Sequence, residues 1–349
     1  ALSPSASELA VDAGTFHPTY LVAVPRVLEK VAAAAQATAG VGLRARLFAW
    51  ARDAAVAHSR AQQEGGPSGT VRVRRAVADT LVLRRVRRSL GGRLRTVFVG
   101  GSAVHPPLAH FFRGAGIDVL EGYGLTETCA QTTVNRPGAA TIGSVGPPLP
   151  GCEVRIDEHG HVLVFGPHVF AGYEGEPART ARWLDTGDLG WLDPAGRLYI
   201  TGRSKDILVT ASGKNVAPAA LEDAVRAHPL VAECVVVGDD RPFVAALLTL
   251  DEEALAAWCV RRGRPTLALP DASADAELRA ELTAAIAHAN AAVSRAESIR
   301  EFTVLDRPLT LHDGHLRPSL KVRRNVVLAQ FAPVVDELYA QAARRRGPA

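Results

Sequence analysis

The chain contains 349 residues, of which 47% are hydrophobic and 22% charged, and its formal net charge is +4 at pH 7. Domains commonly contain about 100–200 residues, so the length predicts more than one domain and a large core. No apolar run approaches the roughly 20 residues that a transmembrane helix needs, and no signal-peptide pattern opens the chain. The four cysteines stand at neither metal-ligand nor redox spacing, which indicates a reducing compartment such as the cytoplasm.

The first part of the chain is predicted to alternate between helices and strands. A short strand precedes Pro25, and Gly91-Gly92 ends a long helical region. The strands that follow each run into a glycine loop, which is typical of a parallel α/β sheet. The predicted helices cover about 27–62, 74–90 and 106–113, and the predicted strands cover 95–101 and 117–124.

The pattern changes near Gly202. Before it, two strand–turn–strand units are predicted; after it, apolar strands and helices alternate in a compact α+β unit. We therefore predict two domains, 1–202 and 203–349, with the boundary at 202–206. The later predicted elements are strand pairs at 153–166, 191–203 and 231–250, strands at 206–210 and 298–305, and helices at 218–228, 251–262, 273–297 and 320–345.

Two basic runs, 72–75 and 84–88, raise the question of a nucleic-acid partner. Neither contains interleaved aromatic residues, and aromatic residues make up only 5% of the chain. We interpret both runs as solvated helix faces and expect no nucleic-acid partner.

Two glycine loops, Gly100–Ala103 and Glu121–Thr128, follow neighbouring predicted strands. Open α/β sheets bind ligands at this end of their strands, and glycine lets the backbone approach a ligand closely. In the second loop Tyr123 offers a ring to stack on a base, Thr126 a hydroxyl for a phosphate, and Glu127 a carboxylate for Mg²⁺. Each loop taken alone is equally compatible with a tight turn and a helix cap.

Further polar residues could complete a nucleotide site. The carboxylate of Asp188 suits the two hydroxyls of a ribose, and Arg203 could reach a ribose or a phosphate. Lys321 could bring one ammonium group to a phosphate in a transition state. Taken singly, these residues are also compatible with exposed turns and a helix start in water.

Taken in order, YGLTET (123–128), TGD (186–188), GRSKD (202–206), SGKN (212–215) and the lysine of PSLK (318–321) resemble the adenylate-forming superfamily. That superfamily includes acyl-CoA synthetases, luciferases and peptide-synthetase adenylation domains. Four longer stretches resemble the bacterial long-chain fatty acyl-CoA synthetases: residues 24–30, 91–104, 111–128 and 294–305.

The resemblance implies an α/β fold with a C-terminal α+β domain. The first domain would be the C-terminal part of a large adenylation domain, with a mixed or parallel sheet and a small β-barrel-like region. A small mobile domain would follow a hinge near 203–206. The implied reaction activates a fatty acid with ATP and Mg²⁺ to acyl-AMP, and CoA then displaces AMP. Partners would be these small molecules, with at most peripheral membrane contact.

The resemblance also implies roles for individual residues. Adenine would contact Gly101, Ser102, Ala103, Glu121, Gly122, Tyr123 and Gly124, and Asp188 and Arg203 would hold the ribose. Thr126 would bind phosphate, Glu127 would bind Mg²⁺, and these two residues would be catalytic together with Lys321. Lys205 would be the hinge, and the CoA path would be lined by Gly213, Lys214 and Asn215.

The chain departs from the family pattern at several places. The family's Ser/Thr/Gly-rich phosphate loop has no counterpart in residues 1–100, and the hairpin reads Gly160-His161-Val162 where the family usually has Gly-Glu-Ile. We therefore expect a truncated fragment with little ligase activity of its own. A non-catalytic nucleotide-binding remnant, and a ligase for an aryl or amino acid, are the alternatives. The acyl chain length and the oligomeric state do not follow from the sequence.

Overall fold

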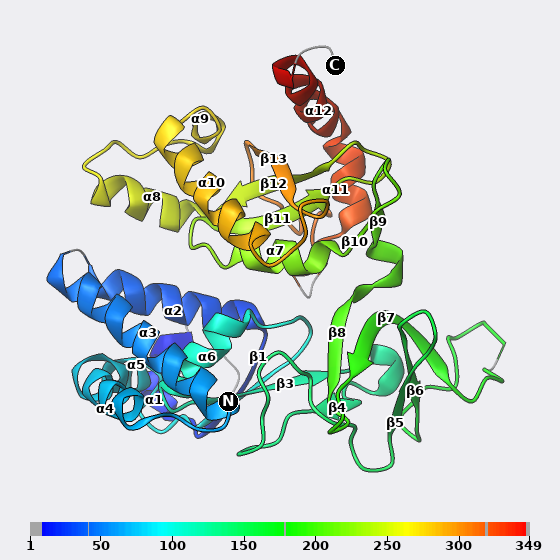
Figure 1. The fold of residues 1–349 in the computed structure, drawn as a ribbon, viewed down its shortest axis with the longest axis horizontal. Coiled ribbons are helices and arrows are strands. Elements are labelled where there is room, and N and C mark those ends of the chain that lie inside the picture. Colours follow the sequence, from blue (N-terminus) through cyan, green and yellow to red (C-terminus); the bar gives the residue numbers. More distant parts are fainter. Residues whose placement is uncertain (1–8, 41, 178, 318–319, 347–349) are drawn as a thin grey trace. The chain divides into compact units, whose positions relative to one another are not determined.

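The computed structural model describes residues 9–40, 42–177, 179–317 and 320–346 (Figure 1). The chain divides into two compact units, Ala1–Thr201 and Gly202–Ala349. Within the described ranges, no helix combines the length and the apolar character needed to cross a membrane.

A four-stranded sheet lies at the centre of the first unit. The strand order is β1-β2-β3-β4; β1, β2 and β3 run parallel, and β4 is antiparallel to β3. Helix α6 (Pro106–Gly114) forms the crossover between β2 and β3. This confirms the predicted α/β alternation. The strands are β1 (Tyr20–Ala23), β2 (Thr96–Val99), β3 (Asp118–Tyr123) and β4 (Thr133–Val134).

Helices surround this sheet and bury one continuous core with it. The predicted helical region 27–62 is in fact two helices, because Gly40 and Gly42 adopt positive φ angles of 66° and 73° and break it. The predicted helix 74–90 starts earlier, where Ser68 caps it. The helices are α1 (Leu9–Phe16), α2 (Pro25–Ala39), α3 (Leu43–Gln63), α4 (Gly69–Ala78), the π-helical turn η1 (Asp79–Leu83) and α5 (Arg84–Ser89).

A second four-stranded sheet follows, in the order β5-β6-β7-β8. Strands β5 and β6 form the predicted antiparallel hairpin, and β7 pairs with β6. Strand β7 starts seven residues before the predicted 191, because Leu184 and Asp185 already pair with β6. The sheet corresponds to the expected small β region. Its strands are β5 (Glu153–Ile156), β6 (His161–Phe165), β7 (Leu184–Leu192) and β8 (Leu198–Arg203).

The second unit is built on a three-stranded sheet, β11 (Val231–Val237), β12 (Val244–Leu250) and β13 (Ile299–Val304). Strands β11 and β12 are antiparallel, as predicted, and β12 and β13 are parallel. Alternate residues enter different cores, so Leu247 packs into one and Leu248 into the other. Burial of both faces explains the continuous apolar sequence of β12.

Helices cover the two faces of this sheet. Helices α7 (Pro218–Arg226) and α10 (Ala276–Asn290) contribute to one core, and α11 (Arg324–Gln330) and α12 (Ala332–Arg346) to the other. The structure has two helices, α11 and α12, where the sequence predicted a single helix over 320–345. The remaining elements of the unit are η3 (Ser204–Asp206), β9 (Leu208–Val209), β10 (Asn215–Val216), α8 (Glu252–Arg261) and α9 (Leu269–Ala272).

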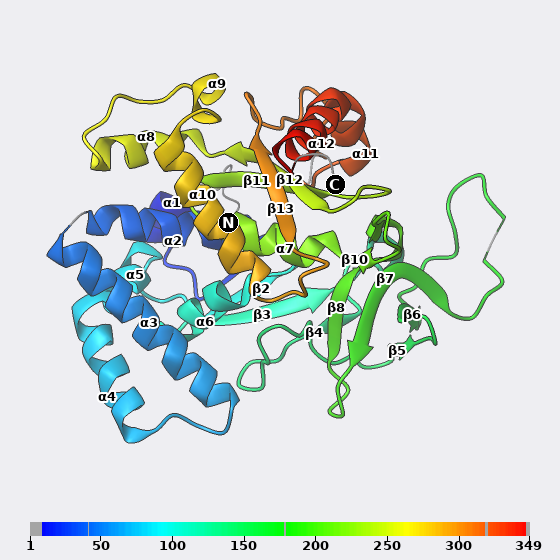
Figure 2. The ribbon, with the colours of Figure 1, turned by 45° about the horizontal axis from the view of Figure 1, so that its top comes forward.

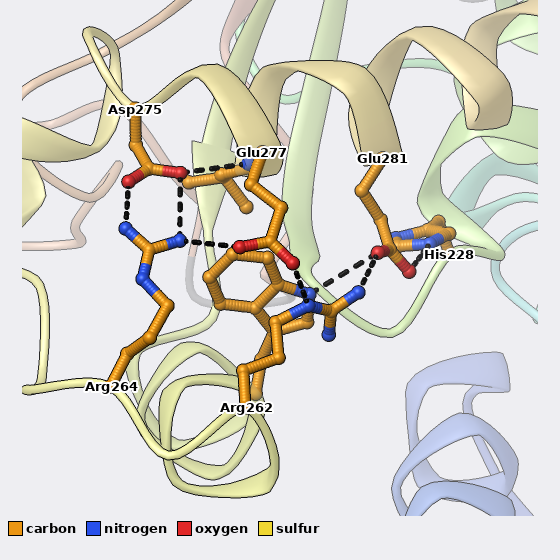
Figure 3. Close-up of polar contacts among 8 residues, drawn as sticks. His228, Arg262, Arg264, Asp275, Glu277 and Glu281 are labelled. Carbon is orange, nitrogen blue, oxygen red and sulfur yellow. Dashed lines mark hydrogen bonds and ion pairs between the residues drawn. The ribbon is translucent and has the colours of Figure 1, made fainter.

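An ion-pair network joins the end of α8 to α10 over a buried tryptophan (Figure 3). The guanidinium carbons of Arg262 and Arg264 lie 4.2 Å and 5.4 Å from the centre of the Trp258 ring. Arg262 donates to Glu277 and Glu281, with N···O distances of 2.6 Å and 2.7 Å. These contacts enclose the indole, which is only 1% exposed.

Candidate nucleotide-binding site

The two glycine loops start at the same edge of the first sheet. Val99, the last residue of β2, pairs with Glu121 of β3. A Cβ placed on Gly100 would lie 3.7 Å from the carbonyl oxygen of Gly122, so the two loops are neighbours. The expected adjacency of the two strand ends is therefore present.

The side chain of Glu121 is used inside the protein. It is buried, and its carboxylate accepts hydrogen bonds from the backbone N–H groups of Val104 at 3.2 Å and Gly143 at 3.3 Å. Burial raises the pKa of Glu121 to about 7, and the two backbone hydrogen bonds oppose this shift. The Glu121 carboxylate thus ties the second glycine loop to Val104, which directly follows the first loop, and to Gly143.

Tyr123 and Asp188 come together from different sheets. The Tyr123 hydroxyl donates to the Asp188 carboxylate at 2.7 Å, although the two residues are 65 apart in the sequence. Asp188 lies in β7 and is 4% exposed, and its N–H donates to the Thr186 hydroxyl at 3.1 Å. The two residues that were expected to hold adenine and ribose therefore share one site in the first unit.

Arg203 is the last residue of β8, which is next to β7 in the sheet order. By residue number it belongs to the second unit.

The loop after β3 is closely packed around Gly124. A Cβ there would lie 1.7 Å from the carbonyl oxygen of Ala130, so only glycine fits without a backbone shift. The short 3₁₀-helix η2 (Thr126–Thr128) follows, with Thr126 exposed and Glu127 half-buried. This packing fixes where the Thr126 and Glu127 side chains leave the backbone.

Glu127 is held by a segment that the sequence did not reveal as part of the site. The Tyr173 hydroxyl donates to the Glu127 carboxylate, and the Phe170 N–H donates to the Glu127 carbonyl oxygen at 2.9 Å. Hydrogen bonding to Glu127 raises the pKa of Tyr173. Tyr173 and Glu127 are 46 residues apart in the chain, so no local sequence pattern indicates that they are in contact.

A single carboxylate is a reasonable donor set for Mg²⁺, because this ion commonly binds through one or two carboxylates and substrate phosphates. Within the described ranges, no group of three or more histidine, cysteine, aspartate or glutamate side chains could form a metal cage. Glu127 therefore fits a magnesium ion that arrives with a nucleotide.

The remaining predicted residues lie in the second unit. Lys205 is in η3. Gly213 has a φ of 75° in the turn before β10, where the Lys214 N–H donates to the Thr210 hydroxyl at 3.2 Å. Asn215 is the first residue of β10.

Lys321 is exposed, and its carbonyl oxygen accepts from the Arg317 N–H at 2.8 Å. Two residues of its motif, Pro318 and Ser319, lie outside the described residues.

The chain is similar in sequence to known ligases. The chain is 46% identical over 330 residues to the long-chain-fatty-acid–CoA ligase FadD15 of Mycobacterium bovis, covering 93% of this chain and 55% of that protein. It is 31% identical to the long-chain-fatty-acid–CoA ligase ACSBG2 of Gallus gallus, covering 93% and 47% of the two chains. The chain thus spans about half the length of the curated relatives it matches.

Solved structures show the same fold at lower identity. The adenylation domain of a carboxylate reductase from Mycobacterium chelonae superposes with a TM-score of 0.71 at 22% identity, covering 97% of this chain and 49% of that chain. The O-succinylbenzoate coenzyme A synthetase of Bacillus subtilis, in complex with ATP and magnesium ion, gives 0.56 at 24% identity, with coverage of 92% and 54%.

Family models account for most of the chain. Residues 3–174 match the AMP-binding enzyme model, and residues 205–343 match the AMP-binding enzyme C-terminal domain. The loops at the ends of β2 and β3 lie in the first match, and the Lys321 segment lies in the second. The chain therefore belongs to the family of AMP-binding enzymes.

Proposed function

We propose that this chain provides nucleotide-binding and catalytic parts of a ligase that activates a long-chain fatty acid with ATP and transfers it to CoA. The single observation that carries the proposal is the hydrogen bond between Tyr123 and Asp188, because it joins the expected adenine and ribose residues in one place. The 46% identity to a long-chain-fatty-acid–CoA ligase supports the choice of acid.

The proposed reaction has two steps. An oxygen of the fatty acid carboxylate attacks the α-phosphorus of ATP, and pyrophosphate leaves with the electrons of the broken P–O bond. The CoA thiol then loses its proton and attacks the acyl carbon, and AMP leaves. A mixed anhydride is already activated, so the second step mainly requires positioning. Magnesium, when bound, would neutralise charge on the phosphates.

In the first unit, the residues would divide this work by chemistry. Tyr123 would stack on adenine, with the backbone of the two glycine loops around it. The Asp188 carboxylate would accept hydrogen bonds from the ribose hydroxyls, the Thr126 hydroxyl would bind a phosphate, and Glu127 would hold Mg²⁺. The adenine-contacting backbone would be that of Gly101, Ser102, Ala103, Glu121, Gly122 and Gly124.

In the second unit, Lys321 would stabilise negative charge that develops on the α-phosphate. Arg203 would contact the ribose, and Lys205 would be the hinge of a domain rotation between the two steps. The turn at Gly213, Lys214 and Asn215 would then line the CoA path. We also propose a cytoplasmic location with peripheral membrane contact, because the substrate is a lipid.

Binding of an acyl-adenylate analogue tests the nucleotide site directly. Palmitoyl sulfamoyl adenosine is titrated into the chain by calorimetry, and Asp188→Asn is expected to weaken binding by about tenfold, the effect of one hydrogen bond to a charged group. Asp185→Asn is the matched control, since Asp185 lies in the same strand but is exposed. Equal affinities for all three proteins would contradict the assignment of Asp188.

Acid-dependent ATP–pyrophosphate exchange by the longest natural form of the protein tests the reaction and the acid. Exchange with palmitate, and not with aryl or amino acids, is the expected result. Exchange only with another acid would overturn the fatty acid assignment. Binding of the analogue without exchange for any acid would favour a non-catalytic nucleotide-binding protein.

The catalytic lysine is tested by measuring the two steps separately in that longest form. Lys321→Ala should slow adenylation by at least about tenfold while sparing thiolysis of supplied palmitoyl-AMP. Lys30→Ala is the control, because Lys30 lies in none of the five ordered motifs at 123–128, 186–188, 202–206, 212–215 and 318–321. Equal losses in both steps would contradict the role of Lys321. Lys205→Pro should have the opposite effect and harm thioester formation, because proline fixes φ at the proposed hinge.

A further inference from the structure

A row of exposed apolar side chains runs along α4 and η1 in the first unit. Val73, Val77 and Leu81 are 65%, 46% and 41% exposed. Each lies four residues after the previous one, so the three side chains share one side of the helix. In both views α4 lies beyond α3, on the side of the unit away from the strands (Figures 1 and 2).

Arginines border this apolar row. The segment Gly69–Ser89 contains seven arginines and a single acidic residue, Asp79. Five of the seven arginines are exposed. The exposed arginines are Arg72, Arg74, Arg84, Arg85 and Arg88.

The one carboxylate of the segment is turned away from the solvent. Asp79 is 9% exposed and accepts from Arg84 at 3.1 Å and from Arg87 at 2.6 Å. Arg75 lies 3.7 Å from the same carboxylate. The charge of Asp79 is thus neutralised inside the protein, and every exposed charged side chain of the segment is cationic.

We propose that the exposed side of Gly69–Ser89, called the basic stripe below, docks on the surface of an anionic lipid bilayer. A helix that carries an apolar row bordered by arginines can lie in the plane of the interface, with its apolar side chains among the acyl chains and its guanidinium groups among the phosphates. At about 1.5 Å per residue the segment presents a contact of about 30 Å. The inference deepens the peripheral contact proposed above.

A bilayer fits the basic stripe better than a nucleic acid does. The centre of the stripe is aliphatic, and aliphatic side chains gain nothing from a phosphate backbone, whereas they gain free energy in the acyl region. The stripe contains no exposed aromatic residue that could stack on a base. The guanidinium of Arg85 is held near the row by donating to the Leu81 carbonyl oxygen at 2.9 Å.

Vesicle sedimentation with the chain as it exists tests the proposal without requiring catalysis. We expect binding to phosphatidylcholine vesicles that contain about 30% phosphatidylglycerol, and little binding to phosphatidylcholine alone. Binding should weaken strongly in roughly 0.5 M NaCl, because the Debye length then falls to a few ångströms. Absence of phosphatidylglycerol-dependent binding would overturn the proposal, and it would leave the adenylation chemistry untouched.

Two variants locate the contact. Replacing Arg84, Arg85 and Arg88 with glutamine should lower the partition coefficient on the order of 100-fold, since each cation near an anionic surface contributes about fivefold. Replacing Val73, Val77 and Leu81 with serine should lower it by at least about tenfold. The matched control replaces three exposed arginines of the second unit, Arg261, Arg295 and Arg300, with glutamine.

Equal losses in the control would show a general charge effect and overturn the basic stripe as the contact. A loss with the arginine variant alone, together with equally tight binding to duplex DNA, would identify a polyanion-binding surface and overturn the bilayer. An environment-sensitive label at Val77→Cys in a Cys129→Ser background should shift to the blue only when lipid is added. In the longest natural form, a label already shielded before lipid would show that protein covers the stripe, which would also overturn the proposal.

Discussion

Glu121→Gln is expected to change how the stability of the first unit depends on pH. The folded protein raises the pKa of this carboxyl from 4.5 to about 7, mainly through burial. The folded state therefore binds the proton more tightly than the unfolded state does. The stabilisation from the proton is complete below about pH 4.5 and is lost as the pH rises through about 7, and the difference corresponds to about 3 kcal/mol.

Glutamine cannot titrate, so the stability of the variant does not fall in this way as the pH rises. Near pH 5 it should be less stable than the parent by about 1 kcal/mol, because its single oxygen can accept from only one of the Val104 and Gly143 N–H groups. Near pH 8.5 the order should reverse, with the variant more stable by about 2 kcal/mol. The two stability curves should therefore cross between these values.

Urea unfolding followed by tryptophan fluorescence measures this effect, because three of the four tryptophans, Trp50, Trp183 and Trp191, lie in the first unit. Glu158→Gln serves as the control, since Glu158 is an exposed hairpin residue that should show no such crossing. A stability difference between parent and Glu121→Gln that stays constant from about pH 5 to about pH 8.5 would refute the reasoning.

Three further changes test the packing around the site and the core of the second unit. A double-mutant cycle of Tyr123→Phe and Asp188→Asn should give a coupling of about 1–3 kcal/mol in unfolding, and zero coupling would mean that the hydrogen bond does not form in solution. Gly124→Ala should destabilise the first unit by more than about 2 kcal/mol because its Cβ would collide with a backbone oxygen, whereas Gly100→Ala, which meets only an ordinary contact at 3.7 Å, should cost clearly less in thermal unfolding. Trp258→Ala should cost the second unit about 3–5 kcal/mol, measured by denaturant unfolding followed by circular dichroism, and a loss under 1 kcal/mol would contradict its burial.

Local patterns were sufficient to predict much of the fold. The apolar run of β12 and the strand–glycine–loop units of β2 and β3 are visible in the sequence, because strand periodicity and glycine turns depend on near neighbours. The same reasoning failed where local signals were ambiguous. The TGD half of β7 contains turn-forming residues, yet pairing with β6 makes it a strand. Gly40 and Gly42 broke a region whose alanine content predicted one helix.

The sequence by itself determined the order of the motifs and hence the family, since residue types at fixed spacing are a property of the chain alone. Only the tertiary structure decided that the Tyr123 hydroxyl meets Asp188, that Tyr173 holds Glu127, and that the Glu121 carboxylate is buried between two loops. The physical reason is that these contacts join residues far apart in the chain. Their partners depend on how the sheets and loops pack, and such packing leaves no short-range periodicity in the sequence.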